Sequence, residues 1–421
     1  MSGRREFFKW GLGGAAVLAA GGGLIAYQSY PINAWQRAVV ETWQPLNSNL
    51  ASGEARLTEL VRLACLAANS HNTQPWKFRL AENSLTIIPD FPRRTPVVDP
   101  DDHHLFASLG CAVENIVQAA PELGLAPRVE LPADLQDGIT VRLESTAIGP
   151  SPLAQMIHLR QCTRADFDGK PIANEDLKAL EAAAAGGKTN LTLLASPEGI
   201  SHFARLIADA AMNQMQDSTF VAELKDWIRF SYGQALDTRD GLFSLCSGNP
   251  ALPGPVGRVL LGFVATPASE SQRYERQVKA TSGIAIFSSA EDNPQNWFEA
   301  GRSYQRFALE ATRLGLKHSF VNQPVEVPAF HADLLKAAGR AEGRADLVVR
   351  FGYGPEMPRS LRRPVEAVIV LSSASPLPAA RHRDRIIAST GEIKWQSRNF
   401  TPPTSHQPEG AARAGLYPPM A

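Results

Sequence analysis

The stretch of residues 67–78 constrains the fold more than any other, because a run of small polar side chains joins a helix pattern to a strand pattern. Apolar residues recur at helical spacing over residues 57–68, whereas Trp76 and Phe78 alternate with polar residues as in a half-buried strand. The polar run is therefore predicted to lie at a helix C-terminus, where backbone groups lack intrahelical partners.

Two amides in this run, Asn72 and Gln74, each carry a donor and acceptors. Together they could match the alternating N–H and C=O edge of a heteroaromatic ring such as flavin. Taken alone, the run is better explained as an ordinary polar turn between a helix and a strand.

The run resembles the Pro-Ser-Ser-x-Asn-x-Gln-Pro-Trp motif of the FMN-dependent nitroreductase family. The matching residues are Ser70, Asn72, Gln74, Pro75 and Trp76. Ala68 and Asn69 stand where the family usually has proline and serine. The resemblance implies an α+β fold of the nitroreductase type and bound FMN. In this segment it implies flavin contacts from Asn69, Ser70, Asn72 and Gln74.

The phosphate of FMN needs cations, and arginine offers bidentate, charge-assisted hydrogen bonds. Residues 157–167 resemble the phosphate segment of the family, and on a helix Arg160 and Arg164 would lie one turn apart with Thr163 beside them. A further cation is expected before Pro364, with Arg362 the first choice and Arg363 the second. Without the resemblance, an arginine pair at this spacing indicates a solvated basic face.

Two further segments bear on the flavin. Residues 321–327 resemble the Pro-x-Glu segment of the family, whose backbone runs along the ring, with matches at Pro324 and Glu326. Val327 stands where glycine is often found and would crowd the ring face. The glycine- and proline-rich residues 248–257 form either a lid over the flavin or a long surface connection.

The chain contains a weak internal repeat. Residues 110–125 and 301–316 share their first glycine, an alanine and the closing Leu-Gly-Leu at one offset of 191 residues (301 − 110). Each segment predicts a buried helix ending at a glycine cap and leading to a strand. A second helix pair is predicted to begin at Leu57 and at Asn174, with Asn174 as an N-cap, but only the first helix leads to the amide-rich motif. The resemblance implies two fused sheet-and-helix halves that form an intramolecular pseudo-dimer with one flavin site.

Composition excludes several classes of function. Lysine plus arginine equal aspartate plus glutamate at 42 each, so no basic field indicates nucleic-acid binding. The four cysteines lack metal-ligand spacing and are predicted to be buried free thiols, although an exported protein could pair two of them. The acidic and histidine residues 99–104 are predicted to form a solvated loop, and no metal site is expected.

The N-terminus resembles a twin-arginine export signal. Arg4 and Arg5 precede residues 10–27, which carry no charge and are mostly small or apolar. This pattern predicts a protein that is periplasmic, or anchored to the outer face of the inner membrane if the signal is not cleaved. The tail is rich in proline and serine and is predicted to be disordered.

The predicted organisation is a signal or anchor (1–27), a first half (28–150), a second half (151–371) and the tail (372–421). The leading hypothesis is an FMN-dependent oxidoreductase, a monomeric pseudo-dimer that passes electrons from a small-molecule donor to a nitro, quinone or similar acceptor. Because the cofactor carries the chemistry, no side chain is assigned as acid or base. The rivals are an FMN-binding, sequestering protein with little turnover, and an interaction module whose site has decayed.

Overall fold

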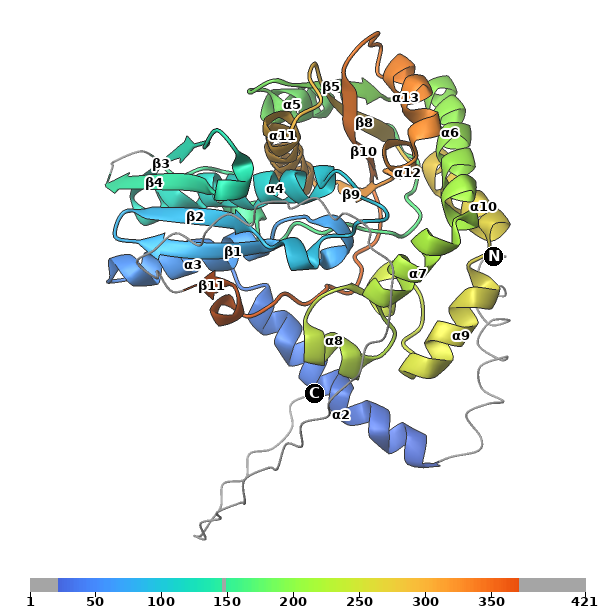
Figure 1. Cartoon of the computed structure of the whole chain (residues 1–421), viewed down its shortest axis with the longest axis horizontal. Helices are drawn as coiled ribbons and strands as arrows, with labels where there is room; N and C mark the ends of the chain where they lie inside the picture. Colours follow the sequence, from blue (N-terminus) through green and yellow to red (C-terminus); the bar gives the residue numbers. More distant parts are fainter. Residues whose placement is uncertain (1–21, 146–148, 371–421) are drawn as a thin grey trace, which may run out of the picture. The chain divides into compact units, whose positions relative to one another are not determined.

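The computed structural model of the chain describes residues 22–145 and 149–370 (Figure 1). Most of the predicted export signal and all of the predicted tail lie outside these residues. Within the described part, no helix has both the length and the apolar character that a membrane crossing requires.

The first half of the chain builds a sheet that the end of the described chain completes. Its five strands run in the order β11-β1-β2-β4-β3. Four strands come from the first half: β1 (Trp76–Ala81), β2 (Ser84–Pro89), β3 (Leu125–Glu130) and β4 (Ile139–Ser145). The fifth, β11 (Ile369–Val370), pairs in parallel with β1. The second half therefore contributes a strand to the sheet of the first half.

The second sheet repeats the topology of the first. Its strands are β5 (Thr189–Leu194), β8 (Gly283–Ser289), β9 (Lys317–Phe320) and β10 (Arg344–Gly352), in the spatial order β5-β8-β10-β9. In chain order, β5, β8, β9 and β10 correspond to β1, β2, β3 and β4, and corresponding strands have corresponding neighbours. All pairs among these eight strands are antiparallel. The weak sequence repeat therefore corresponds to a repeated arrangement of strands.

Helices precede and connect these strands in the same way in both halves. The first strands follow α3 (Gly53–Cys65) and α5 (Asn174–Ala184), and α4 (His103–Ala119) and α11 (Pro294–Arg313) lie between the second and third strands. Asn174, the predicted N-cap of α5, is instead its first residue, and Ala173 occupies the cap position. The helices α4 and α11 lie side by side in the middle of the molecule (Figure 1).

The repeated glycines allow the backbones of α4 and α11 to touch. A Cβ atom added at Gly110 would lie 2.0 Å from the carbonyl oxygen of Phe298, and one added at Gly301 would lie 1.9 Å from that of Ala107. The offset of 191 residues that relates Gly110 to Gly301 also relates Ala107 to Phe298 (298 − 107). The two contacts therefore join equivalent positions of the two halves, with the glycine in one half in one contact and in the other half in the other contact.

A long insert distinguishes the second half. β1 and β2 form a hairpin, whereas residues 195–282 separate β5 from β8. The insert contains α6 (Pro197–Gln216), α7 (Ser218–Trp227), β6 (Ile228–Arg229), α8 (Tyr232–Thr238), β7 (Leu242–Phe243), α9 (Gly254–Val264) and α10 (Pro267–Lys279). The remaining helices are α2 (Gly22–Thr42), α12 (Gln323–Glu326) and α13 (His331–Ala337). The sequence patterns predicted only residues 248–257 of this insert, as a lid or a connection.

The insert explains the burial pattern of β8. Ala285 and Phe287 belong to the main core, whereas Ile284 and Ile286 belong to a second core with residues of α6 and α13. Every residue of β8 is buried, because helices cover both faces of the second sheet. In the first sheet Trp76 and Phe78 face the main core while Arg79 is exposed, so the predicted alternation of β1 is confirmed.

Candidate functional site

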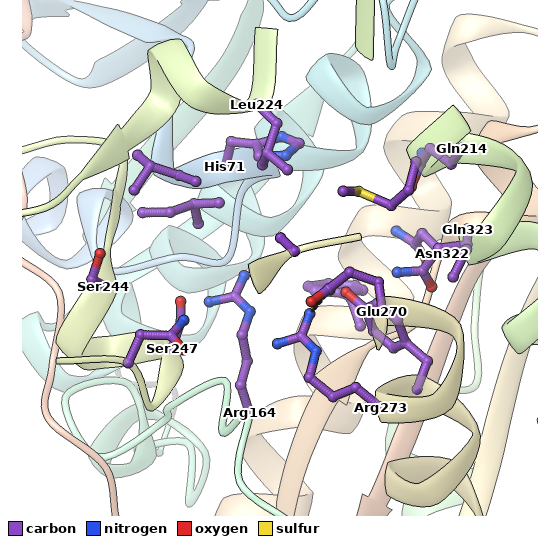
Figure 2. Close-up of a pocket in the computed structure, with 18 of the residues that line it drawn as sticks. His71, Arg164, Gln214, Leu224, Ser244, Ser247, Glu270, Arg273, Asn322 and Gln323 are labelled. Carbon is purple, nitrogen blue, oxygen red and sulfur yellow. Dashed lines mark hydrogen bonds and ion pairs between the residues drawn. The ribbon is translucent and has the colours of Figure 1, made fainter. Parts of the chain in front are cut away.

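A cavity of about 1140 Å³ lies where both halves meet the insert (Figure 2). One wall comes from residues 68–71 and α4, and another from Arg164 and the segment of Phe320 to Glu326. Parts of α6, α9 and α10 and the residues between β7 and α9 complete the lining. Small-molecule sites usually measure roughly 300–1,000 Å³, so this cavity has room for a cofactor and a second molecule.

The motif loop that forms one wall is strained. His71 (φ 47°), Asn72 (φ 54°) and Gln74 (φ 54°) all have left-handed backbone conformations. Such conformations cost about 1–3 kcal/mol each in residues other than glycine, and they persist where the surroundings enforce them. Strain of this kind is concentrated at functional sites, which draws attention to His71, whose side chain lines the cavity.

The amide side chains of the motif hold this strained loop in place. Asn72 Nδ2 donates to the carbonyl oxygens of Gly241 (3.0 Å) and Leu361 (3.2 Å). Gln74 Nε2 donates to Arg239 O (2.9 Å), and Gln74 Oε1 accepts from the backbone N–H of Arg363 (2.7 Å). Neither amide lines the cavity, whereas the neighbouring Asn69 and Ser70 do.

Two of the predicted phosphate-binding arginines cap a helix instead of lining the cavity. Arg160 Nη2 donates to Leu66 O (2.8 Å), and Arg362 Nε donates to Cys65 O (2.9 Å). These carbonyls lie at the C-terminus of α3, where a positive charge is favourable. Burial, followed by the nearby charge of Arg160, lowers the pKa of Arg362 to about 9. The two guanidinium groups therefore anchor the base of the motif loop.

Three more of the predicted site residues also lie outside the cavity lining. Thr163 is fully buried, and its N–H donates to His318 O (2.8 Å). Pro324 is buried within α12. The guanidinium group of Arg363 donates to Gln74 O (3.3 Å) and lies 3.5 Å from Asp90. Val327, expected to crowd the ring face, is likewise not part of the lining.

Arg164 is the predicted arginine that does line the cavity. Its guanidinium group makes no hydrogen bond or ion pair with the described residues. Arg273 and Arg276 of α10 also line the cavity, and Arg273 is paired with Glu270. Figure 2 shows the side chains of Arg164 and Arg273 pointing toward the same part of the cavity. Sequence reasoning missed the two arginines of α10, because nothing in the motifs indicated that the insert folds over the site.

An ion pair forms another part of the wall. Glu326 Oε2 accepts from Gln214 Nε2 (2.7 Å), and Glu326 Oε1 lies 3.3 Å from His104 Nε2. Burial acts to raise the pKa of Glu326, but the hydrogen bond and charge of His104 hold it below its ordinary value. Burial acts to lower the pKa of His104, but the hydrogen bond and charge of Glu326 raise it above its ordinary value. Burial lowers the pKa of His71 to about 4. The contact between His104 and Glu326 thus favours the charged form of each, whereas burial keeps His71 neutral near neutral pH.

The predicted solvated loop at residues 99–104 is wrong, because Asp99, His103 and His104 are all buried. Their potential ligand atoms lie within 4.8 Å of one another. The carboxylate of Asp99 accepts the backbone N–H groups of His104 and Leu105 at the start of α4. His103 Nε2 lies 3.4 Å from Asp346 of β10. Asp99 and His104 therefore have partners on the protein in place of the solvent expected from the sequence, and the partner of His104, Glu326, belongs to the other half of the chain.

Comparison with known proteins finds distant sequence relatives. No protein-family model matches the chain. A protein of Mycobacterium tuberculosis provisionally named an NAD(P)H nitroreductase is 26% identical over 342 residues, covering 77% of this chain and 93% of its own. Another protein of that organism with the same provisional description, acg, is 23% identical over 328 residues, covering 73% of this chain and 93% of its own. A third, uncharacterised, is 22% identical over 367 residues, covering 82% and 100%.

Solved structures give weaker matches. A nitroreductase of Bacteroides fragilis with bound FMN is 14% identical, covers 56% of this chain and 98% of its own, and has a TM-score of 0.31. Iodotyrosine deiodinase bound to FMN and 3-iodo-L-tyrosine is 11% identical, covers 53% of this chain and 100% of its own, and has a TM-score of 0.34. TM-scores at this level do not establish a common fold. The chain is therefore similar in sequence to proteins provisionally named NAD(P)H nitroreductases, and its own architecture is α+β.

Proposed function

We propose that the protein binds one FMN in the cavity and is an FMN-dependent oxidoreductase of the nitroreductase type. The observation that carries this proposal is the presence of two features on opposite walls of the cavity. One is the strained motif loop, and the other is the guanidinium group of Arg164, which has no partner among residues 22–145 and 149–370. A cation without a partner at the wall of a cavity favours an anionic ligand group, and a phosphate meets that requirement.

The residues present fit such a ligand. Arg164, with Arg273 beside it, would hold the phosphate, and Asn69 and Ser70 offer polar groups to the ring. When bound, the flavin would accept a hydride or electrons from a reduced donor and pass them to a nitro, quinone or similar acceptor. The His104–Glu326 pair would supply a fixed charge at the wall, and the insert would limit the access of water.

The same proposal includes an intramolecular pseudo-dimer. The equal strand order of the two sheets and the reciprocal contacts of Gly110 and Gly301 support it, because an exchange of halves relates both features. A motif loop of this kind occurs only in the first half, which favours one flavin site in a monomeric chain.

A sequestering function is the second candidate. The residues from Gly248 to Leu252 and the inner side of α9 line the cavity, so this segment of the insert lies where a lid would lie. If that lid excludes a nicotinamide, its hydride cannot come within the roughly 3–3.5 Å needed for reaction.

One experiment tests binding and separates the two functions. We expect the purified protein to release one FMN per chain, and its flavin band to bleach rapidly when NADH or NADPH is added without oxygen. A nitroaromatic compound or a quinone should then restore the band. Release of FAD, or of two flavins per chain, would contradict the proposed site. Bleaching by a small chemical reductant but not by a nicotinamide would favour sequestration.

Export through the twin-arginine route remains part of the proposal, and Arg4 and Arg5 directly before the uncharged residues 10–27 support it. We expect a reporter fused to the first 27 residues to reach the periplasm. Changing both arginines to lysine should keep the reporter in the cytoplasm, as fractionation of the cells would measure. Equal export of the two fusions would exclude this route.

A further inference from the structure

The helix α9 of the insert carries apolar side chains on two of its three sides. Its inner side, which includes Leu261, forms part of the cavity wall. A second side faces α7, where Arg258 pairs with Asp226 (2.9 Å). The third side carries Val259 and Phe263, which are 61% and 76% exposed. An apolar side chain that a helix turns outward normally packs against another protein surface or against lipid.

The exposed patch of α9 is unusual for the described part of the chain. Ten large hydrophobic residues are markedly exposed there, and half of them belong to this helix. The five are Val256, Val259, Leu260, Phe263 and Val264. Clustered apolar exposure of this kind marks a binding surface for a protein, a ligand or a membrane.

The patch also borders the mouth of the cavity. Leu260 and Val264 line the cavity and are nevertheless 44% and 62% exposed. A group that lines a cavity and meets solvent lies at its opening. The opening beside α9 is therefore rimmed by aliphatic side chains, and an apolar molecule could pass it without losing contact with apolar surface.

The size of the patch argues against a second copy of the chain as its partner. A stable protein interface usually takes about 20–30 residues from each side. The patch offers five side chains on a helix of 11 residues, about 16 Å long. A membrane needs only one apolar stripe lying in the interfacial region.

The connection to the N-terminus favours a membrane as the occupant. The uncharged residues 10–27 run into α2, and Trp35 of α2 packs edge-on against Tyr232 of α8. Gln234 of α8 in turn lies against Gly254, the first residue of α9. The helix that follows the apolar stretch is thus seated on the same insert that carries the exposed patch.

We propose that α9 is a membrane-docking helix that lays Val256, Val259 and Phe263 into the surface of a lipid bilayer and opens the cavity toward it. This arrangement suits a lipid-soluble quinone as the acceptor, a step that rests on the proposed function. Its reduction to the hydroquinone consumes two electrons and two protons, which a hydride from the reduced flavin and one proton from solvent supply.

Vesicle flotation tests the docking helix in the full chain. The apolar N-terminal stretch is first interrupted by Leu18→Arg and Ile25→Arg, so that it cannot hold the protein on lipid. We expect this parent to float with phosphatidylcholine vesicles, and the added pair Val259→Glu and Phe263→Glu to reduce the floating fraction at least tenfold. The matched control is Val40→Glu with Leu131→Glu, which changes two exposed apolar residues elsewhere and should float like the parent.

Each other outcome overturns the proposal. Equal flotation of the α9 variant and the parent would remove α9 from membrane binding. A parent that does not float but elutes as a dimer, and becomes monomeric with the α9 changes, would identify a second copy as the partner. If the protein with its unchanged N-terminus neither floats nor dimerises, and Val259→Glu destabilises it, then another segment of the chain itself covers the exposed side of α9.

The quinone is tested separately, with the flavin content of every variant measured from its absorbance. After chemical reduction, we expect the α9 changes to slow reoxidation by a long-chain quinone in vesicles at least tenfold, and to leave reoxidation by a short water-soluble quinone unchanged. Equal slowing with both quinones would exclude α9 as the entry route. Flotation as expected from protein without flavin would leave the docking helix in place and overturn the proposed function instead.

Discussion

Arg164→Ala should weaken FMN binding by about 1.5–3 kcal/mol, or roughly 10- to 150-fold in Kd, because it removes a cation at the cavity wall that has no partner in the described part of the chain. Riboflavin, which lacks the phosphate, should bind the variant and the parent with similar affinity. Fluorescence titration of both ligands into both proteins isolates the contribution of the phosphate. Lysine at this position should restore part of the difference, since it keeps the charge but not the planar fork.

Arg160→Ala is the informative comparison for that experiment. Arg160 is 2% exposed and bonds the carbonyl of Leu66, so its removal should lower the free energy of unfolding. If instead Arg164→Ala binds FMN normally and a folded Arg160→Ala protein loses it, the phosphate lies at the buried arginines that cap α3. The proposed position of the ligand would then be incorrect.

Gly301→Ala should destabilise the protein by about 3 kcal/mol or more, because the new methyl group would lie 1.9 Å from the carbonyl oxygen of Ala107. The opposing atom belongs to the backbone of α4, so relief requires the two central helices to separate. Gly110→Ala should cause a similar loss through the reciprocal contact with Phe298. Chemical denaturation, followed by circular dichroism, measures both effects.

Gly53→Ala provides the matched control for the central glycines. Gly53 is also helical, in α3, but no atom lies within 4 Å of the position that a methyl group added there would take. Alanine should therefore be neutral there, or stabilising by up to about 1 kcal/mol. Equal denaturation midpoints for the parent and the Gly301→Ala protein would show that α4 and α11 can part at little cost. The central packing would then not be the feature that joins the halves.

The sequence alone determined the local patterns and the repeat. The alternation in β1 and the helical spacing of α3 are properties of neighbouring residues, and the structure confirms both elements. The two glycines recognised at one offset are those that meet across α4 and α11. Each of these features depends on period or on the size of a side chain, which can be read from the chain without knowing its partners.

Tertiary structure alone decided which polar groups face the cavity. The left-handed backbone at His71 and Asn72 turns the amide away from the cavity and the imidazole into it, and the partners that hold Asn72 are Gly241 and Leu361, far along the chain. Arg160 and Arg164 differ in the same way, since only the former meets the carbonyls of α3. The direction of a polar side chain depends on distant hydrogen-bonding partners, and a local motif does not contain them.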